Sequence, residues 1–213
     1  DRLETIGIPF ENARLGLAVP SYVTINTIEE LNANKERFKG EIIGIDIGAS
    51  LMNLTEDAVN DYDLQLKLMP SSGPTMTAFL QKSVEHNDWI VVTGWTPHWM
   101  FARYDLKFLD DDKGVYGDTE HIAAVATKGF SETHPFVAAF FRNFRFTNEQ
   151  LSELMNIMED YPLRELEGAK VWLKKHPEIV DLFLPSQANN LTQLNGYETD
   201  RENSLPAAGT GNQ

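Results

Sequence analysis

The chain has 213 residues, with 18 basic and 32 acidic side chains, a formal net charge of −14 and no cysteine. This length can bury a core in one large domain or two small ones, while the negative charge argues against nucleic acid and anionic membrane surfaces as partners. The lack of cysteine excludes disulfides and thiol catalysis, and no stretch approaches the roughly 20 apolar residues that span a bilayer.

The first 40 residues have the pattern of two strands and one helix. Thr5–Pro9 and Arg14–Val19 are predicted to be the strands, and Pro20 stops the second one. The capping-box pattern at Thr27–Glu30 predicts a short helix, which should end before Gly40.

Residues 41–93 alternate strand and helix patterns, which predicts a parallel sheet with right-handed crossovers. The expected strands are Glu41–Asp46, Leu64–Met69 and Trp89–Val92. The two helices between them are marked by apolar residues at helical spacing, namely Leu51, Leu54, Ala58 and Tyr62 in the first and Met76, Phe79, Leu80 and Val84 in the second.

Trp95 follows the third of these strands, which we expect to end at Thr93-Gly94. Ligands of open α/β sheets bind at the carboxyl ends of strands. A tryptophan on such a loop either caps the core or offers its face to a ligand. We favour the ligand for Trp95 because Gly94 leaves room for close approach, whereas Trp89 and Trp99 are expected to pack.

Two more strands are expected further along, at Asp105–Leu109 and His121–Thr127. The Ala-Ala-Val-Ala sequence within the second one predicts close packing. The acidic segment Asp110–Gly114 is interpreted as a solvated turn, because it lacks the bidentate acid that ends a calcium loop.

The remainder of the chain is predicted to be helical and then disordered. Helices are expected at 135–144, 151–158, 167–175 and 177–184, and a capping box at Thr147–Gln150 begins the second of them. From residue 186 onward polar residues, Gly and Pro dominate, which predicts disorder.

The sequence contains no recognisable pattern of catalytic or metal-binding residues. We find no nucleophile–base–acid pattern and no pair of histidines at metal-binding spacing, so no catalytic residue, metal or cofactor is expected. His98 lies inside the tryptophan segment, and a hydrogen-bonded loop histidine is its simplest interpretation.

The turn Ile47–Ser50 joins a strand to a helix start at the same sheet edge as Trp95. It can be an ordinary turn, but the first amides of a helix are unpaired, lie at its positive end and can bind a carboxylate. With an indole face beside it and no Lys or Arg expected nearby, this edge suits a ligand that carries a carboxylate and a bulky cation. Indole faces hold quaternary ammonium through cation–π attraction worth roughly 0.5–2 kcal/mol.

Two blocks of the sequence, Gly44–Met52 and Val92–Phe101, resemble the glycine betaine/proline betaine-binding proteins of osmoprotectant ABC importers. The Gly-Trp-Thr-Pro-His-Trp part of the second block is specific, and the resemblance covers roughly residues 10–184. It implies an α/β lobe of the type II periplasmic-binding-protein kind, with a mostly parallel sheet flanked by helices. It also implies an extracytoplasmic location, a betaine ligand and an importer permease subunit as partners.

The resemblance further implies five ligand-binding residues, namely Gly48, Ser50, Leu51, Trp95 and His98. Trp95 would be one wall of an aromatic cage around the ammonium, and the amides of Ser50 and Leu51 would hold the carboxylate. The family often has proline and a second glycine in the turn where this chain has Ile47 and Ser50.

The family's other lobe, with further cage aromatics and a carboxylate-binding histidine, is not found in this sequence. We therefore expect a C-terminal portion with four parts: the end of the other lobe and a hinge crossover (1–40), the ligand-binding α/β lobe (41–127), a helical return segment (128–185) and a disordered tail (186–213). Two alternatives stay open, a ligand-sensing or structural lobe without a transport role and an enzyme that acts on choline-like compounds.

Overall fold

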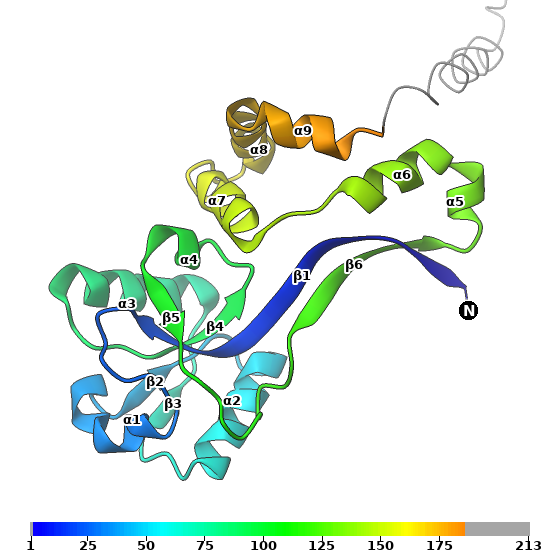
Figure 1. Cartoon of the computed structure of the whole chain (residues 1–213). Coiled ribbons are helices and arrows are strands. Elements are labelled where there is room, and N and C mark those ends of the chain that lie inside the picture. Colours follow the sequence, from blue (N-terminus) through cyan, green and yellow to red (C-terminus); the bar gives the residue numbers. More distant parts are fainter. Residues whose placement is uncertain (1, 186–213) are drawn as a thin grey trace, which may run out of the picture.

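The computed structural model describes residues 2–185, and Figure 1 shows a sheet-based lobe from which a long ribbon leads to a group of helices. The strands are β1 (Leu3–Pro20), β2 (Glu41–Ile43), β3 (Lys67–Met69), β4 (Val92–Thr96), β5 (Leu106–Phe108) and β6 (Glu120–Thr127). The helices of the lobe are α1 (Glu30–Ala33), the 3₁₀ helix η1 (Lys35–Phe38), α2 (Ser50–Asp61), α3 (Gly73–His86) and α4 (Met100–Arg103). The remaining helices are α5 (Phe130–Thr133), α6 (Pro135–Asn143), α7 (Asn148–Glu159), α8 (Glu165–Lys175) and α9 (Pro177–Phe183).

The lobe is a mixed sheet with the strand order β3-β2-β4-β1-β5 and helices on both faces. β2 pairs in parallel with β3 and β4, so the predicted α/β alternation over residues 41–93 is confirmed. α2 buries Leu51 and Ala58 on one face, and α3 buries Met76 and Leu80 on the other. Phe79 of α3 was expected on the buried face but is half exposed.

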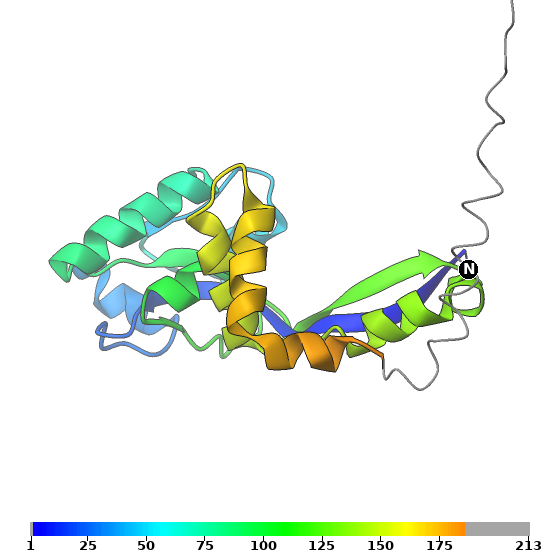
Figure 2. The same ribbon diagram turned by 90° about the horizontal axis from the view of Figure 1, so that it is seen from above.

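β1 is one continuous strand, so the prediction of two separate strands in this region is wrong. Its carboxyl-terminal half pairs with β4 and β5, while its amino-terminal half pairs with β6, always antiparallel. The last of three register shifts against β6 lies between Glu11 and Ala13, where Asn12 has a positive φ of 63°. The irregularity falls between the two predicted segments, and the β1/β6 ribbon leads away from the lobe in both views (Figures 1 and 2).

β4 begins at Val92, where the sequence predicted its end, and runs through Trp95 to Thr96. The reason is antiparallel pairing with β1, in which Leu15 lies opposite Trp95. A Cβ atom at Gly94 would lie 3.0 Å from the Cβ of Ala18 and 3.2 Å from the Phe108 ring. The missing side chain therefore serves packing within the sheet and does not make room for a ligand.

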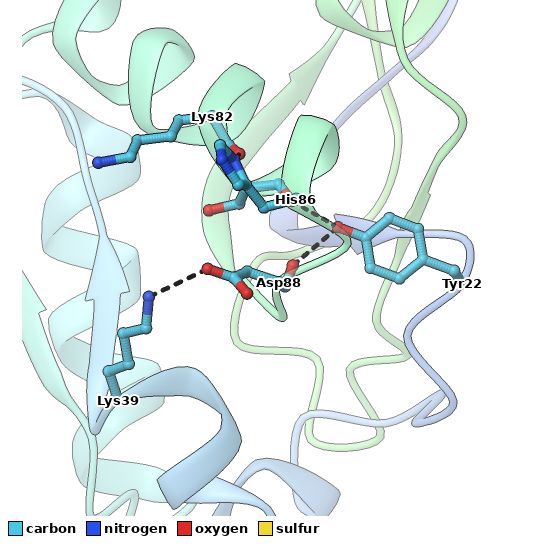
Figure 3. Close-up of polar contacts among 6 residues, drawn as sticks. Tyr22, Lys39, Lys82, His86 and Asp88 are labelled. Atoms are coloured by element: carbon cyan, nitrogen blue, oxygen red, sulfur yellow. Dashed lines mark hydrogen bonds and ion pairs between the residues drawn. The ribbon is translucent and has the colours of Figure 1, made fainter.

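Tyr22 and Lys39 hold the segment before β4 through polar contacts to Asp88 (Figure 3). The hydroxyl of Tyr22 donates to the carbonyl oxygen of Asp88 at 2.7 Å, and the Asp88 carboxylate pairs with Lys39 at 3.4 Å. Trp89, which follows, is 8% exposed and packs against Phe38 with a centroid distance of 5.2 Å. The packing role predicted for Trp89 is confirmed.

β6 forms at the predicted place, but its predicted close packing is wrong. Val125 is 57% and Ile122 is 45% exposed. β6 pairs with β1 in a ribbon, and α6 packs against the β1 strand of that ribbon at Gly7, where a side chain would collide with the carbonyl oxygen of Phe141. Among residues 2–185 the cores are built elsewhere, so these apolar side chains of β6 stay at the surface.

The four predicted carboxyl-terminal helices are confirmed as α6, α7, α8 and α9. The capping box that starts α7 is present, with Thr147 and Gln150 each accepting from the other's backbone amide. A separate core forms around Trp172, Ile179 and Phe183. No helix in the described part of the chain is long and apolar enough to cross a bilayer, and the predicted disordered tail at 186–213 lies outside the described residues.

Candidate functional site

The turn before α2 and the end of β4 lie at one edge of the sheet. β2 and β4 are parallel, so the chain leaves both strands at this edge. Trp95 lies opposite Leu15 of β1, and both side chains pack against the core cluster that contains α2. Trp95 also packs against the cluster on the α3 side, so the indole touches both cores at the end of β4.

The first turn of α2 has two free backbone donors. Its N-cap is Ala49, in an extended conformation (φ −64°, ψ 140°), and no side chain caps the helix. The amide of Met52 donates to the carbonyl oxygen of Ala49 at 2.9 Å. Within residues 2–185 the amides of Ser50 and Leu51 have no acceptor, and the first turn has no acidic residue.

The start of α2 is held against β2 by Met52. Its sulfur accepts a hydrogen bond from the Ile45 amide at 3.3 Å and fills the space that a side chain at Gly44 would need. Gly48 has a φ of 91°, which favours glycine, and is exposed, as is Ser50. Leu51 is 4% exposed and packs its side chain in the core, so only its backbone amide, and not its side chain, is proposed as a ligand contact.

Trp95 is half-buried and lines a pocket of about 320 Å³ together with Leu54 and Tyr116. Arg14, Asp118 and Glu120 are the charged residues of the same pocket. The expectation that no Lys or Arg lies near Trp95 is therefore wrong, because β1 pairing brings Arg14 opposite Thr96. The turn at 47–51 does not line this pocket, so the two predicted halves of the site share an edge of the sheet but not this cavity.

Tyr116 and Thr55 connect the loop after β5 to the start of α2, a contact that sequence reasoning missed. The Tyr116 hydroxyl donates to Thr55 Oγ1 at 3.1 Å, and Thr55 Oγ1 donates to the carbonyl oxygen of Leu51 at 2.7 Å. Burial raises the pKa of Tyr116, so this hydroxyl keeps its proton. The sequence contains no local pattern for a contact between residues 61 positions apart.

Asp111 fixes the same loop, although Asp110–Gly114 is otherwise the exposed turn that the sequence predicted. One Asp111 oxygen accepts from the Tyr62 hydroxyl at 2.7 Å and the other from the Tyr116 amide at 2.8 Å. The Tyr62 hydroxyl also accepts from the Lys113 amide at 2.7 Å, and burial followed by the bond to Asp111 raises its pKa to about 12. The described residues contain no cluster of three or more His, Cys, Asp or Glu that could hold a metal ion.

His98 is 8% exposed and lies between two indoles. Its ring centroid is 4.3 Å from that of Trp95 and 5.3 Å from that of Trp99, and its Nδ1 accepts from the Met100 amide at 3.1 Å. Burial lowers its pKa to about 4, so the ring is neutral at pH 7. Trp99 packs against the core cluster on the α3 side, as predicted.

The comparisons with known proteins agree with this architecture. Residues 2–175 match the family described as the substrate binding domain of ABC-type glycine betaine transport systems. The glycine betaine/carnitine transport binding protein GbuC of Listeria monocytogenes is 45% identical over 148 residues, which cover 68% of this chain. The chain spans about half (49%) of the length of that relative.

Two solved structures share both the fold and part of the sequence. The glycine betaine/L-proline-binding protein ProX of Borrelia burgdorferi superposes with a TM-score of 0.69 and 35% identity, covering 87% of this chain and 71% of its own. Lactococcal OpuAC, in its closed form with glycine betaine, gives a TM-score of 0.66 and 35% identity over 86% and 71% of the two chains. The predicted type II periplasmic-binding-protein-like lobe is thus confirmed, and the matching family is one of binding proteins and not of enzymes. The prediction of a mostly parallel sheet is wrong, because β1 pairs antiparallel with β4, β5 and β6 and makes the sheet mixed. This chain belongs to the family of substrate-binding domains of ABC-type glycine betaine transport systems.

Proposed function

We propose that the chain is part of the solute-binding component of an ABC importer and captures glycine betaine or a related quaternary-ammonium osmolyte outside the cytoplasm. The observation that carries this proposal is the uncapped start of α2 at the same sheet edge as Trp95. A betaine has one carboxylate and one cation that cannot donate hydrogen bonds. Free amides and an indole face are the groups that bind these two ends without a charged side chain.

In this proposal Trp95 is one wall of an aromatic cage, and the Ser50 and Leu51 amides hold the carboxylate. Gly48 shapes the turn with its positive φ, which brings the chain into the first turn of α2. The ligand reaches a permease subunit of the importer by opening and closing of the binding protein. Glycine betaine and carnitine, which appear in the names of the relatives, are quaternary-ammonium carboxylates and support this class of ligand.

Substitution of Trp95 tests the proposal, with Trp89 as a matched control on the same segment. Trp95→Ala in the full gene product should weaken glycine betaine binding by about 1–2 kcal/mol or more, on the scale of cation–π contacts. Trp89→Ala should leave affinity nearly unchanged and lower the free energy of unfolding by roughly 3 kcal/mol, as loss of a buried aromatic does. Titration calorimetry and thermal melts measure both, and unchanged affinity in a folded Trp95→Ala variant would refute the cage assignment.

A further inference from the structure

His98 and Trp95 form an edge-to-face pair at the end of β4. The two ring planes are at 80° and the centroids 4.3 Å apart, which is a favoured geometry for aromatic pairs. On its other side the imidazole meets Trp99 at 5.3 Å, with a ring angle of 32°. His98 therefore fills the space between the pocket-lining indole and an indole of the core.

The hydrogen bond from the Met100 amide defines the tautomer of this ring. Nδ1 accepts that bond at 3.1 Å, so it carries no proton and the proton of the neutral ring is on Nε2. A proton on Nδ1 would face the Met100 N–H, and two donors repel each other. The backbone and the burial of the ring thus both favour the uncharged form.

We propose that His98 is a positioning residue for the Trp95 indole, and that its uncharged ring is needed to leave the electron-rich indole face to a cationic ligand. This inference rests on the proposed function, because it assumes that Trp95 meets a quaternary ammonium. His98 acts through Trp95 and not by touching the ligand. A charge on His98 would place a cation within 4.3 Å of the indole centroid, where it competes with the ammonium for the same ring.

The charged and titratable groups around this pair lie near Trp99 and in the pocket that Trp95 lines. Arg103 lies 4.9 Å from the Trp99 ring centroid and pairs with Asp160 of α7 at 2.9 Å, and Tyr104 is 6.4 Å from Trp99. The pocket on the Trp95 side contains Arg14, Asp118 and Glu120. None of these side chains hydrogen-bonds to His98 within residues 2–185, and burial is the cause that lowers its pKa to about 4.

A first experiment needs no ligand. Long-range ¹⁵N NMR of the 213-residue chain should show the Nε2-protonated tautomer of His98 at pH 7, and the ring should take up its second proton only in acid. The Trp95 indole N–H signal should move with the same midpoint, because the two rings are in contact. An Nδ1-protonated ring, or a Trp95 signal that stays constant while His98 titrates, would overturn the proposal even if the substituted variants fail to fold.

The second experiment uses calorimetry to measure the glycine betaine affinity of the full gene product. Two substitutions of His98 separate the role of its aromatic ring from the role of its hydrogen-bond acceptor. His98→Phe keeps an aromatic ring beside Trp95, and His98→Asn keeps an acceptor for the Met100 amide but has no ring. We expect near-parental affinity for His98→Phe and a loss of about tenfold for His98→Asn, the scale of one cation–π contact. His134→Asn is the matched control, since His134 stacks on Phe130 at 4.6 Å but is exposed.

The pH profile separates positioning from mere packing. Because His98 has a lowered pKa in the folded protein, the betaine affinity of the parent should be level from pH 7 to 5 and fall as the pH drops through about 4, while the affinity of His98→Phe should fall less.

Parental affinity in His98→Asn would show that the ring is not needed. Equal losses in both variants would make His98 a ligand contact, and either result overturns the proposal. A parent protein that binds no betaine would refute the proposed function, whereas the ligand-free titration would still decide the role of His98.

Discussion

Ala49 is the residue that leaves the start of α2 free to bind an anion. N-caps are usually Ser, Thr, Asp or Asn, whose side chains accept hydrogen bonds from the first helical amides. The methyl group of Ala49 cannot do so, and α3 shows the contrast, because its N-cap Ser72 accepts from the Thr75 amide at 3.3 Å. A helix start that lacks its cap loses stability, and its amides stay free for the carboxylate of the proposed ligand.

Ala49→Asp should therefore separate stability from binding. The new carboxylate can accept from the free amides of α2, which should raise the free energy of unfolding by roughly 0.5–2 kcal/mol and weaken betaine binding. Ser72→Ala in α3 is the control and should lower stability without changing affinity. Thermal melts and calorimetry measure both, and an Ala49→Asp variant that is more stable yet binds betaine as tightly as the parent would exclude these amides as the carboxylate site.

Ser50 tests whether an amide or a hydroxyl contacts the ligand. It is the first residue of α2 and follows Ala49 at ψ 140°, so proline fits this position without disturbing the helix. Ser50→Pro removes one amide donor and should reduce betaine affinity severely, whereas Ser50→Ala should bind almost normally. Calorimetry decides, and loss of binding in a folded Ser50→Ala variant would show that the hydroxyl is the contact.

Helix α2 is held by a loop that lies about 60 residues further along the chain. Residues 110–117 reach it through Tyr116 and Thr55, while Asp111 ties the loop to Tyr62 at the end of the helix. The carbonyl that Thr55 bonds belongs to Leu51, one of the two residues with a free amide. The loop therefore holds the helix whose first turn forms the candidate anion site.

A double-mutant cycle measures this coupling. Thr55→Val leaves the buried Tyr116 hydroxyl without its acceptor, which should cost roughly 1–3 kcal/mol of unfolding free energy. Tyr116→Phe removes the other partner, and the double variant should lose clearly less than the sum of the single losses. Urea unfolding gives the three values. Strict additivity would mean that the hydroxyl pair does not contribute as a unit.

At the scale of the whole molecule, the proposed site contains one indole wall and one pair of free amides within residues 2–185. Small-ligand sites usually bury most of the ligand surface, and a half-open site leaves the ammonium in water. A single exposed cation–π contact, worth roughly 0.5–1 kcal/mol, cannot offset the several kcal/mol lost when a ligand is immobilised. The division into a hinge (1–40), a ligand lobe (41–127) and a helical return (128–185) stays a prediction.

We accordingly expect the 213-residue chain alone to fold but to bind glycine betaine no better than about millimolar, for the entropic reason given above. Exposed apolar side chains such as Val125 of β6 and Leu163 before α8 should favour self-association. Calorimetry and sedimentation velocity test both statements. Micromolar binding by a monomer would mean that the missing cage walls lie within these residues.

Local patterns were enough to predict the order of most elements, the start of α2, the capping box of α7 and the membership in the betaine-binding family. They did not predict that β1 is a single strand, nor the short helices α4 and α5. These features depend on periodicity, caps and short motifs, whose physical causes lie within a few residues of each other. The burial of Trp89 and the parallel arrangement over residues 41–93 follow from the same local patterns.

Three features depend on contacts between distant residues: where β4 ends, why position 94 is a glycine and which charges surround Trp95. Strand length depends on a partner, and β4 extends to Thr96 because β1, about 80 residues earlier, supplies antiparallel hydrogen bonds. The same pairing brings Arg14 to the pocket, and the fold joins Asp111 to Tyr62. Such contacts between distant residues leave no local pattern, so the chemistry of the site beyond its motifs became visible only in three dimensions.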